Sequence, residues 1–268
     1  YKNDAVLVTG IEELNRIIDE GSIRYAFQSI VSAKTGEIYG YEALMRPVSD
    51  MLNTPREFIR IAKADAKLNE VERLTWVYGL KEYKKQVDCG NIGSDARIFL
   101  NTIPNNMIDS ESVALLEKTC GDCLQNIVLE ILESEQVNDD FIHKKKKLIS
   151  KWNGLLALDD FGTGYNSEYA LLELSPDLIK IDYSLISGCD KDVGRSNMIR
   201  DIVNIAKRSN IIVLAEGIET YGEMKAVMQC GVDLLQGFYL SKPLYEPVPL
   251  AEDRKKEICE LAEENIER

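Results

Sequence analysis

The sequence predicts an α/β barrel in which eight strands alternate with helices. Six short apolar runs recur along the chain, and stretches of helical periodicity lie between them. Strands separated by helices of this kind are typical of parallel sheets with crossover connections. Two further runs near the N-terminus bring the total to eight, enough to close a barrel. A doubly wound open sheet fits the same alternation and is the competing architecture.

The predicted elements follow one another without a linker or a low-complexity tract. An amphipathic helix at 10–20 leads into two strands, and the helix after them starts at Thr54 before Pro55, a helix start signal. The predicted strands are 24–31, 37–44, 97–101, 126–132, 154–160, 177–182, 210–216 and 233–240. The remaining helices are predicted at 54–68, 69–87, 109–119, 138–152, 166–174, 192–208, 220–230 and 249–268. We therefore expect one domain over 1–268, with 1–24 as its lead-in.

Composition and charge exclude several classes of protein. The net charge of −13 argues against binding of a nucleic-acid polymer, which needs clustered Lys and Arg. No apolar run approaches the roughly 18 residues that span a bilayer, so no membrane contact is expected from this segment. No secretory signal is visible, so the segment is expected to be cytoplasmic. Tyr1 is not a natural start, which is compatible with a segment cut from a longer, membrane-anchored protein.

Cysteine and histidine chemistry is not expected. The six cysteines accompany no secretory signal, which favours reduced thiols. Cys120 and Cys123 form a CxxC pair, but a second pair or a thioredoxin-like context is missing from the sequence. His143, the single histidine, lies beside Lys144–Lys147 on a helix predicted to be exposed.

Nearly every apolar run ends in a polar residue that a core would not accept. In a barrel such positions fall at the C-terminal mouth, where active sites form. These residues are Glu42, Asn101, Glu130, Asp159, Asp160, Lys180, Asp182, Glu216 and Gln236. A single charged strand end is usually only solvated, but a set this large predicts a functional site.

The chemistry of this set points to hard metal ions. Carboxylate and carboxamide oxygens suit Mg²⁺, Mn²⁺ or Ca²⁺ rather than zinc. Asp159 and Asp160 could share two metals, about 3.5–4 Å apart, an arrangement that cleaves phosphoesters. Lys180 would add positive charge near the attacking water or the phosphate. Taken alone, Asp159–Asp160 reads as a helix or loop cap, and the glycine-bearing loop 159–167 as a phosphate cradle or a mobile loop.

Eight ordered motifs resemble those of the EAL family of cyclic di-GMP phosphodiesterases. They extend from about Tyr25 to Pro243 and cover most of the chain. The motifs are FQSIV (27–31), YEALMR (41–46), FLNTIP (99–104), LEILES (129–134), DDFGTGYNS (159–167), IKID (179–182), LAEGIET (214–220) and QGFYLSKP (236–243). Departures from the family pattern are Pro47, Leu132, Asn166, Glu168 and Tyr183, and none of them removes an expected metal ligand.

The resemblance implies a (β/α)₈ barrel with an antiparallel first strand and metal-dependent hydrolysis of cyclic di-GMP to linear pGpG. Its catalytic residues would be Lys180, Glu216 and Glu42, and its metal ligands Glu42, Asn101, Glu130, Asp159, Asp160 and Glu216. Substrate contacts would come from Gln28, Arg46, Asn101, Asp182 and Gln236. Loop support would come from Glu133, Glu219, Gly162, Thr163 and Gly164. The alternative is a non-catalytic cyclic di-GMP receptor.

The resemblance also implies cofactors and a partner. Two Mg²⁺ or Mn²⁺ ions are expected in each site, with Ca²⁺ inhibitory because its looser coordination suits the two-metal geometry poorly. A homodimer is expected through the loop after Asp159–Asp160 and the adjacent helix.

Overall fold

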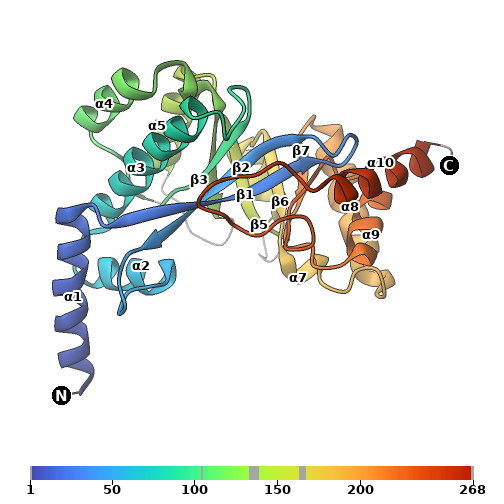
Figure 1. Cartoon of the computed structure of the whole chain (residues 1–268). Helices are drawn as coiled ribbons and strands as arrows, with labels where there is room; N and C mark the ends of the chain where they lie inside the picture. Colours follow the sequence, from blue (N-terminus) through green and yellow to red (C-terminus); the bar gives the residue numbers. More distant parts are fainter. Residues whose placement is uncertain (1, 104, 133–138, 163–166, 267–268) are drawn as a thin grey trace.

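Eight strands form a closed barrel in sequence order in the computed structural model, which describes residues 2–103, 105–132, 139–162 and 167–266 (Figure 1). The strands are β1 (Ile23–Ser32), β2 (Ile38–Pro47), β3 (Arg97–Asn101), β4 (Ile127–Leu132), β5 (Leu155–Phe161), β6 (Leu178–Ile181), β7 (Ile212–Ala215) and β8 (Leu234–Leu235). β1 pairs antiparallel with both β2 and β8, whereas the other neighbouring strands are parallel. The predicted barrel with an antiparallel first strand is confirmed, and the open sheet is wrong.

Helices cover the outside of this barrel. They are α1 (Lys2–Glu20), α2 (Pro55–Ala64), α3 (Leu68–Asp88), α4 (Ser110–Cys120), α5 (Asp139–Lys151), α6 (Ser167–Leu174), α7 (Tyr183–Ile186), α8 (Val193–Arg208), α9 (Tyr221–Cys230) and α10 (Glu252–Ile266), with a short 3₁₀ helix, η1 (Gly121–Asn126). Thr54 caps α2 by accepting a hydrogen bond from the Glu57 N–H, as the start signal predicted. Thr220 and Glu223 form a reciprocal capping box at α9.

Three boundaries differ from the sequence-based expectation by four residues or more. The first helix begins at Lys2 instead of residue 10, and α2 ends at Ala64, where Ala66 adopts a left-handed φ of 55°. The strand predicted at 233–240 contracts to Leu234–Leu235. Gly237 explains the contraction, because a Cβ there would lie 2.1 Å from the Ile218 carbonyl oxygen. The chain turns at this close approach and leaves the sheet.

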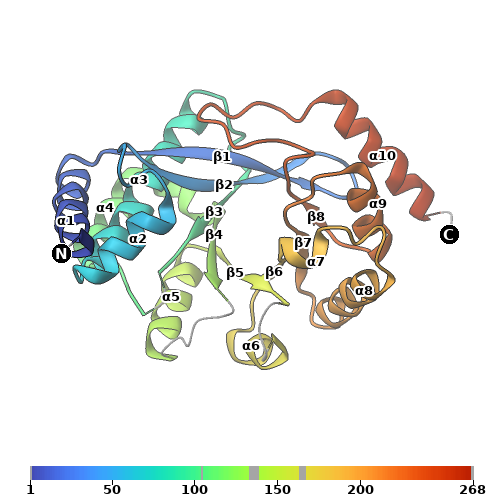
Figure 2. The ribbon, with the colours of Figure 1, turned by 90° about the horizontal axis from the view of Figure 1, so that it is seen from below.

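The helices pack in two groups on opposite sides of the strands (Figure 2). On one side, α3, α4 and α5 bury apolar side chains such as Trp76, Leu116 and Ile149 against the first half of the barrel. On the other, α8, α9 and α10 do the same with Val203, Val227 and their neighbours. The chain ends therefore lie far apart, with α1 beside the first group and α10 beside the second.

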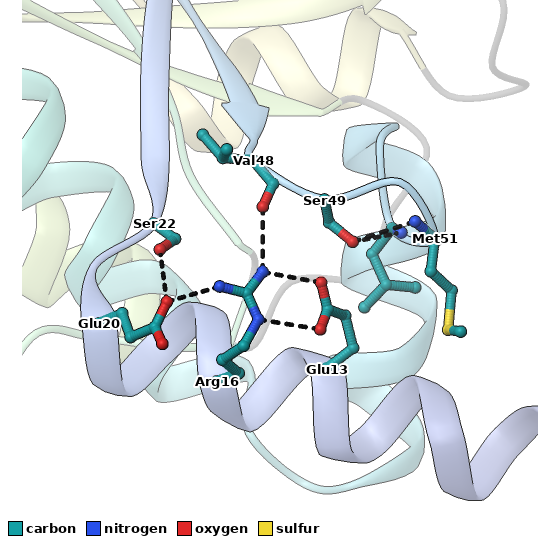
Figure 3. A network of polar contacts seen from close by, with 8 residues as sticks. Glu13, Arg16, Glu20, Ser22, Val48, Ser49 and Met51 are labelled. Carbon is teal, nitrogen blue, oxygen red and sulfur yellow. Dashed lines mark hydrogen bonds and ion pairs between the residues drawn. The ribbon is translucent and has the colours of Figure 1, made fainter.

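Helix α1 is tied to the barrel by a core contact and a polar network. Leu14 and Ile17 are fully buried in a cluster with residues of α2 and α3. Arg16 joins two turns of α1 by ion pairs to Glu13 (2.8 Å) and Glu20 (2.5 Å) (Figure 3). The same guanidinium donates a hydrogen bond to the Val48 carbonyl oxygen at 3.1 Å, just beyond β2.

Two negative expectations concern thiols and membranes. All six cysteines are free, and burial raises the pKa of the Cys120 thiol, so the CxxC pair is not set up for thiolate chemistry. Within the described ranges, no helix has both the length and the hydrophobicity required to cross a bilayer.

Candidate active site

The lumen of the barrel is apolar at its floor and polar directly above. Side chains two residues apart on a strand point to the same face. The apolar layer consists of Ile30, Phe99, Val128, Ala157, Leu178, Leu214 and Leu234. Two residues after the last six of these come Asn101, Glu130, Asp159, Lys180, Glu216 and Gln236. β1 runs in the opposite direction, so Gln28 precedes Ile30 and lies opposite Glu42 of β2. Alternation thus places the predicted polar residues in one layer at the C-terminal mouth.

Lys180 is the centre of this polar layer. Its ammonium is completely buried and lies among four carboxylates from four other strands or strand ends. The distances from its Nζ are 2.7 Å to Glu130, 3.1 Å to Asp159, 3.2 Å to Glu216 and 3.9 Å to Glu42. One positive charge therefore faces up to four negative charges, which leaves a net charge of −3 when all are ionised.

The excess negative charge shifts the protonation of the cluster. Burial raises the pKa of Glu130 well above its usual range, and raises that of Glu216 to about 8, with repulsion from neighbouring carboxylates acting in the same direction. Burial acts to lower the pKa of Lys180, but the surrounding carboxylates outweigh it and hold the pKa well above the usual value. The lysine therefore remains charged while two carboxyl groups resist ionisation.

Two amide side chains bond Glu42 directly, and a third amide bonds one of these two. Its Oε2 accepts a hydrogen bond from Gln236 Nε2 at 2.7 Å, and its Oε1 accepts one from Asn101 Nδ2 at 3.2 Å. Gln236 also donates to Gln28 Oε1 at 3.3 Å, and Gln28 donates to the Ser241 carbonyl oxygen at 3.1 Å. Each of these residues was predicted as a site residue except Ser241, which lies in the motif QGFYLSKP (236–243) but was given no role.

Asp159 and Asp160 occupy a break in β5. The pairing of β5 with β6 shifts register between Leu158 and Phe161, and Asp160 adopts a left-handed φ of 55°. Aspartate tolerates this conformation better than most residues. The break interrupts the strict alternation that would send the two carboxylates to opposite faces. The backbone therefore turns at Asp160, near the end of β5.

Other predicted residues surround the cluster. Arg46 lies four residues beyond Glu42 on β2 and donates to its neighbour's carbonyl oxygen, that of Met45, at 2.8 Å. Asp182 caps α7 by accepting a hydrogen bond from the Ser184 N–H at 2.9 Å, which gives it a structural role in addition to the predicted one. Glu219 has an exposed side chain on the loop after β7.

The predicted support loop is only partly described. Gly162 has a φ of 97°, and a Cβ there would lie 2.6 Å from Leu185 Cδ1, so glycine suits the position. The expected roles of Glu133, Thr163 and Gly164 fall on residues outside the described ranges, as does the departure at Asn166.

One expectation about the lysine-rich helix is wrong. Lys144–Lys147 were expected to be exposed, but Lys145 is 2% exposed and pairs with the fully buried Glu72 of α3 at 2.9 Å. The sequence holds a signal for this, since Lys145 lies three residues after buried Ile142 and four before buried Ile149. That spacing places Lys145 on the inward stripe of α5. His143 is exposed, as predicted.

The polar layer suits a hard cation by its chemistry. In the described part of the chain, no three acidic, cysteine or histidine side chains are spaced to hold a metal as they stand, and Lys180 lies among the carboxylates. The donors are nevertheless oxygen ligands with excess negative charge. Two buried oxygens, Glu130 Oε2 and Gln236 Oε1, have no hydrogen-bond partner among the described residues. Buried polar atoms are normally satisfied, so these fit a site that takes a further partner.

Comparisons with known proteins place most of the chain in one family. The sequence model of the EAL domain family matches residues 11–243. The "Probable cyclic di-GMP phosphodiesterase PdeD" of Escherichia coli is 28% identical over 242 residues, which cover 87% of this chain and 43% of that protein. The chain spans less than half the length of the curated relatives that it matches.

Solved structures with the same fold have been described with nucleotide bound. The cyclic di-GMP-bound standalone EAL protein of Vibrio cholerae is 26% identical, with a TM-score of 0.73 over 86% of this chain and 96% of that one. BlrP1 of Klebsiella pneumoniae, in a complex with manganese and cyclic di-GMP, has a TM-score of 0.71 at 24% identity over 83% of this chain and 56% of that one. The latter likeness concerns the fold alone. Because the family's sequence model matches most of the chain, this protein belongs to the EAL domain family.

Proposed function

We propose that this chain hydrolyses one phosphodiester bond of cyclic di-GMP to give linear pGpG, using divalent cations. The observation that carries the proposal is the cluster of four carboxylates around Lys180 at the mouth of the barrel. Membership of the EAL domain family and relatives named as cyclic di-GMP phosphodiesterases support the choice of substrate.

The residues that would hold the metals supply only oxygen donors. They are Glu42, Asn101, Glu130, Asp159, Asp160 and Glu216. When bound, Mg²⁺ or Mn²⁺ would activate water and stabilise the attacking and leaving oxygens of the phosphodiester. Such ions would also balance the negative charge that Lys180 alone leaves uncompensated. Ca²⁺ is expected to support binding and to inhibit turnover, since its longer and more variable bonds suit this arrangement poorly.

The positions of Lys180, Glu216 and Glu42 suggest a separate catalytic role for each side chain. Lys180, held among the carboxylates, would orient the attacking water and offset charge on the phosphate. Glu216 is 31% exposed, more than the other three carboxylates of the cluster, and would be the best placed to take a proton from water once bound cations offset its raised pKa and favour its ionised form. Hydrogen bonds from Asn101 and Gln236 would keep the Glu42 carboxylate in the orientation that metal binding requires.

Substrate contacts would come from the rim of the same layer. Arg46 offers several N–H donors in a planar fork that matches phosphate or guanine edges. Gln28 and Gln236 lie at the edge of the cluster, linked to each other at 3.3 Å. Asp182 lies just after β6 and would contact the nucleotide while capping α7.

Chromatographic measurement of pGpG formation with Mg²⁺, Mn²⁺, Ca²⁺ or EDTA tests the proposal. Turnover is expected with the first two ions only, and Glu42→Ala is expected to abolish it. Glu37→Ala is the matched control, because Glu37 lies at the other end of the β1–β2 hairpin with its side chain 67% exposed. Tight binding of cyclic di-GMP without any turnover under Mg²⁺ and Mn²⁺ would instead favour the receptor.

We also propose that the chain forms a homodimer through α6 and the loop preceding it. Leu172 on α6 is 80% exposed, an unusual placement for a leucine that a partner subunit would cover. Leu172→Lys is expected to convert a dimer to a monomer in light scattering after gel filtration. A wild-type chain that is monomeric at high concentration would remove this proposal and leave the catalytic one intact.

A further inference from the structure

A second buried charge cluster lies beside the candidate active site and is not part of it. Glu72 of α3 and Lys145 of α5 pair at 2.9 Å, and their side chains are 0% and 2% exposed. Trp76 Nε1 donates to Glu72 Oε1 at 3.1 Å, so an aromatic residue one turn along α3 also holds the carboxylate. Ion pairs this deeply buried are rare, because both charges lose their hydration.

The Glu72–Lys145 pair forms hydrogen bonds with the segment that follows the site residue Asn101. Glu72 Oε2 accepts the N–H of Ile103 at 2.7 Å, and Lys145 Nζ donates to the carbonyl oxygen of the same residue at 2.7 Å. The hydroxyl of Thr102 contacts both charged groups. Glu72, Thr102 and the Ile103 carbonyl thus give the Lys145 ammonium three acceptors for its three N–H groups. Both backbone polar groups of Ile103 are fixed by opposite charges.

The held segment leads directly into the carboxylate cluster. Asn101 is the last residue of β3, and its Nδ2 donates to Glu42 Oε1 at 3.2 Å. The next residue, Thr102, bonds through its N–H to the Glu130 carbonyl oxygen at 3.2 Å. A shift of Ile103 would therefore move the backbone that carries Asn101 and the contact to β4.

We propose that Glu72 and Lys145 are positioning residues that set the orientation of Asn101 for metal binding. This inference rests on the proposed function, since it assumes that Asn101 is a ligand. Stability alone does not explain such a pair, because well-packed apolar residues usually replace a buried ion pair without loss. Apolar replacements, however, cannot bond the N–H and the C=O of Ile103. Mutation of residues that orient a metal ligand typically lowers metal affinity or activity about 10- to 100-fold, so a loss of about this size is expected here.

The decisive variant is the double substitution Glu72→Leu/Lys145→Met. It leaves no unpaired buried charge, so it avoids the unfolding expected of either single change. Calorimetric titration with Mn²⁺ alone, without nucleotide, is expected to show an affinity about 10- to 100-fold below wild type. Hydrogen exchange of the Ile103 amide, measured without metal, is expected to speed up because its acceptor is gone. The thermal midpoint is expected to fall, because the N–H and C=O of Ile103 and the Trp76 indole N–H lose their partners, so a control that loses stability alone is required.

Tyr83→Phe is the matched control from the opposite end of the same strand. Tyr83 donates to the Ala96 carbonyl oxygen at 2.6 Å and accepts from Asn126 at 3.0 Å, in a buried network at the start of β3. This variant is expected to lower the thermal midpoint with unchanged Mn²⁺ affinity. A double variant that binds Mn²⁺ like wild type overturns the positioning role, as does an unchanged Ile103 exchange rate. Wild-type protein that binds no Mn²⁺ and forms no pGpG would overturn the proposed function instead.

Discussion

Lys145 of α5 and Lys180 of β6 are both buried, but they differ in the number of carboxylates that surround them. Among the residues that the structure describes, Lys145 pairs with one carboxylate, that of Glu72, and donates to the neutral oxygens of Thr102 and Ile103. Lys180 has four carboxylates within 3.9 Å and lies next to a buried carboxylate oxygen, Glu130 Oε2, that has no partner among the described residues. The first cluster is balanced in charge, and the second is not.

The difference indicates what each cluster is for. A balanced, fully bonded cluster in a low-dielectric interior is rigid and has no reason to take up another ion. A cluster in which four carboxyl groups surround one ammonium attracts cations, because burial weakens the screening by water and a bound cation favours the ionised carboxylates. The imbalance around Lys180 therefore favours binding of divalent cations, whereas the balance around Lys145 favours positioning.

Lys180→Met is expected to have the largest effect. It removes a group that would stabilise charge on the phosphate, so kcat is expected to fall by about 10²–10³, a range typical of losing one such group. Without metal the variant should also lose stability, and Mn²⁺ should raise its melting temperature more than that of wild type. Steady-state kinetics and thermal melts with and without Mn²⁺ measure both effects. Equal Mn²⁺ shifts in the two proteins would contradict the idea that lysine and metal offset the same charges.

Lys145→Met is expected to act on folding instead. It leaves Glu72 buried and unpaired, which typically costs about 3–5 kcal/mol. Urea unfolding with and without Mn²⁺ measures the loss, and the difference from wild type should persist in Mn²⁺, because Glu72 is outside the proposed metal site. A difference that disappears in Mn²⁺ would contradict this, since it would mean that the ion compensates the Glu72 charge directly.

Addition of metal to the wild-type chain is expected to have an intermediate effect. A ligand at 100 times its Kd stabilises the folded state by about 2.7 kcal/mol. For a chain of this size that corresponds to a rise in melting temperature of roughly 5 °C. Differential scanning calorimetry with Mn²⁺ and then with excess EDTA checks the rise and its reversal. A melting temperature indifferent to Mn²⁺ at millimolar concentration would count against the unbalanced cluster as a cation site.

The sequence predicts the Lys180 cluster far better than the Lys145 cluster. Six of the site residues follow an apolar lumen residue by two positions, so strand periodicity alone places Asn101 or Glu216 at the mouth. Glu72 and Lys145 are 73 residues apart in the sequence and lie on different helices, so only the three-dimensional packing brings them together. Lys145 also stands in a run of four lysines, where polarity suggested solvent and only the spacing from Ile142 indicated burial. The length of β8 depended on a backbone contact at Gly237 that no residue pattern reveals.

The smallest effect is expected where a lysine pairs with a carboxylate at the surface. Lys225 of α9 and Glu264 of α10 approach to 3.2 Å, but their side chains are 35% and 52% exposed. Water and salt screen such pairs, so Lys225→Ala is expected to cost less than about 1 kcal/mol in urea unfolding. Its turnover and Mn²⁺ affinity should equal those of wild type. A loss as large as that of Lys145→Met would mean that proximity of opposite charges, not their burial and balance, determines what these lysines contribute.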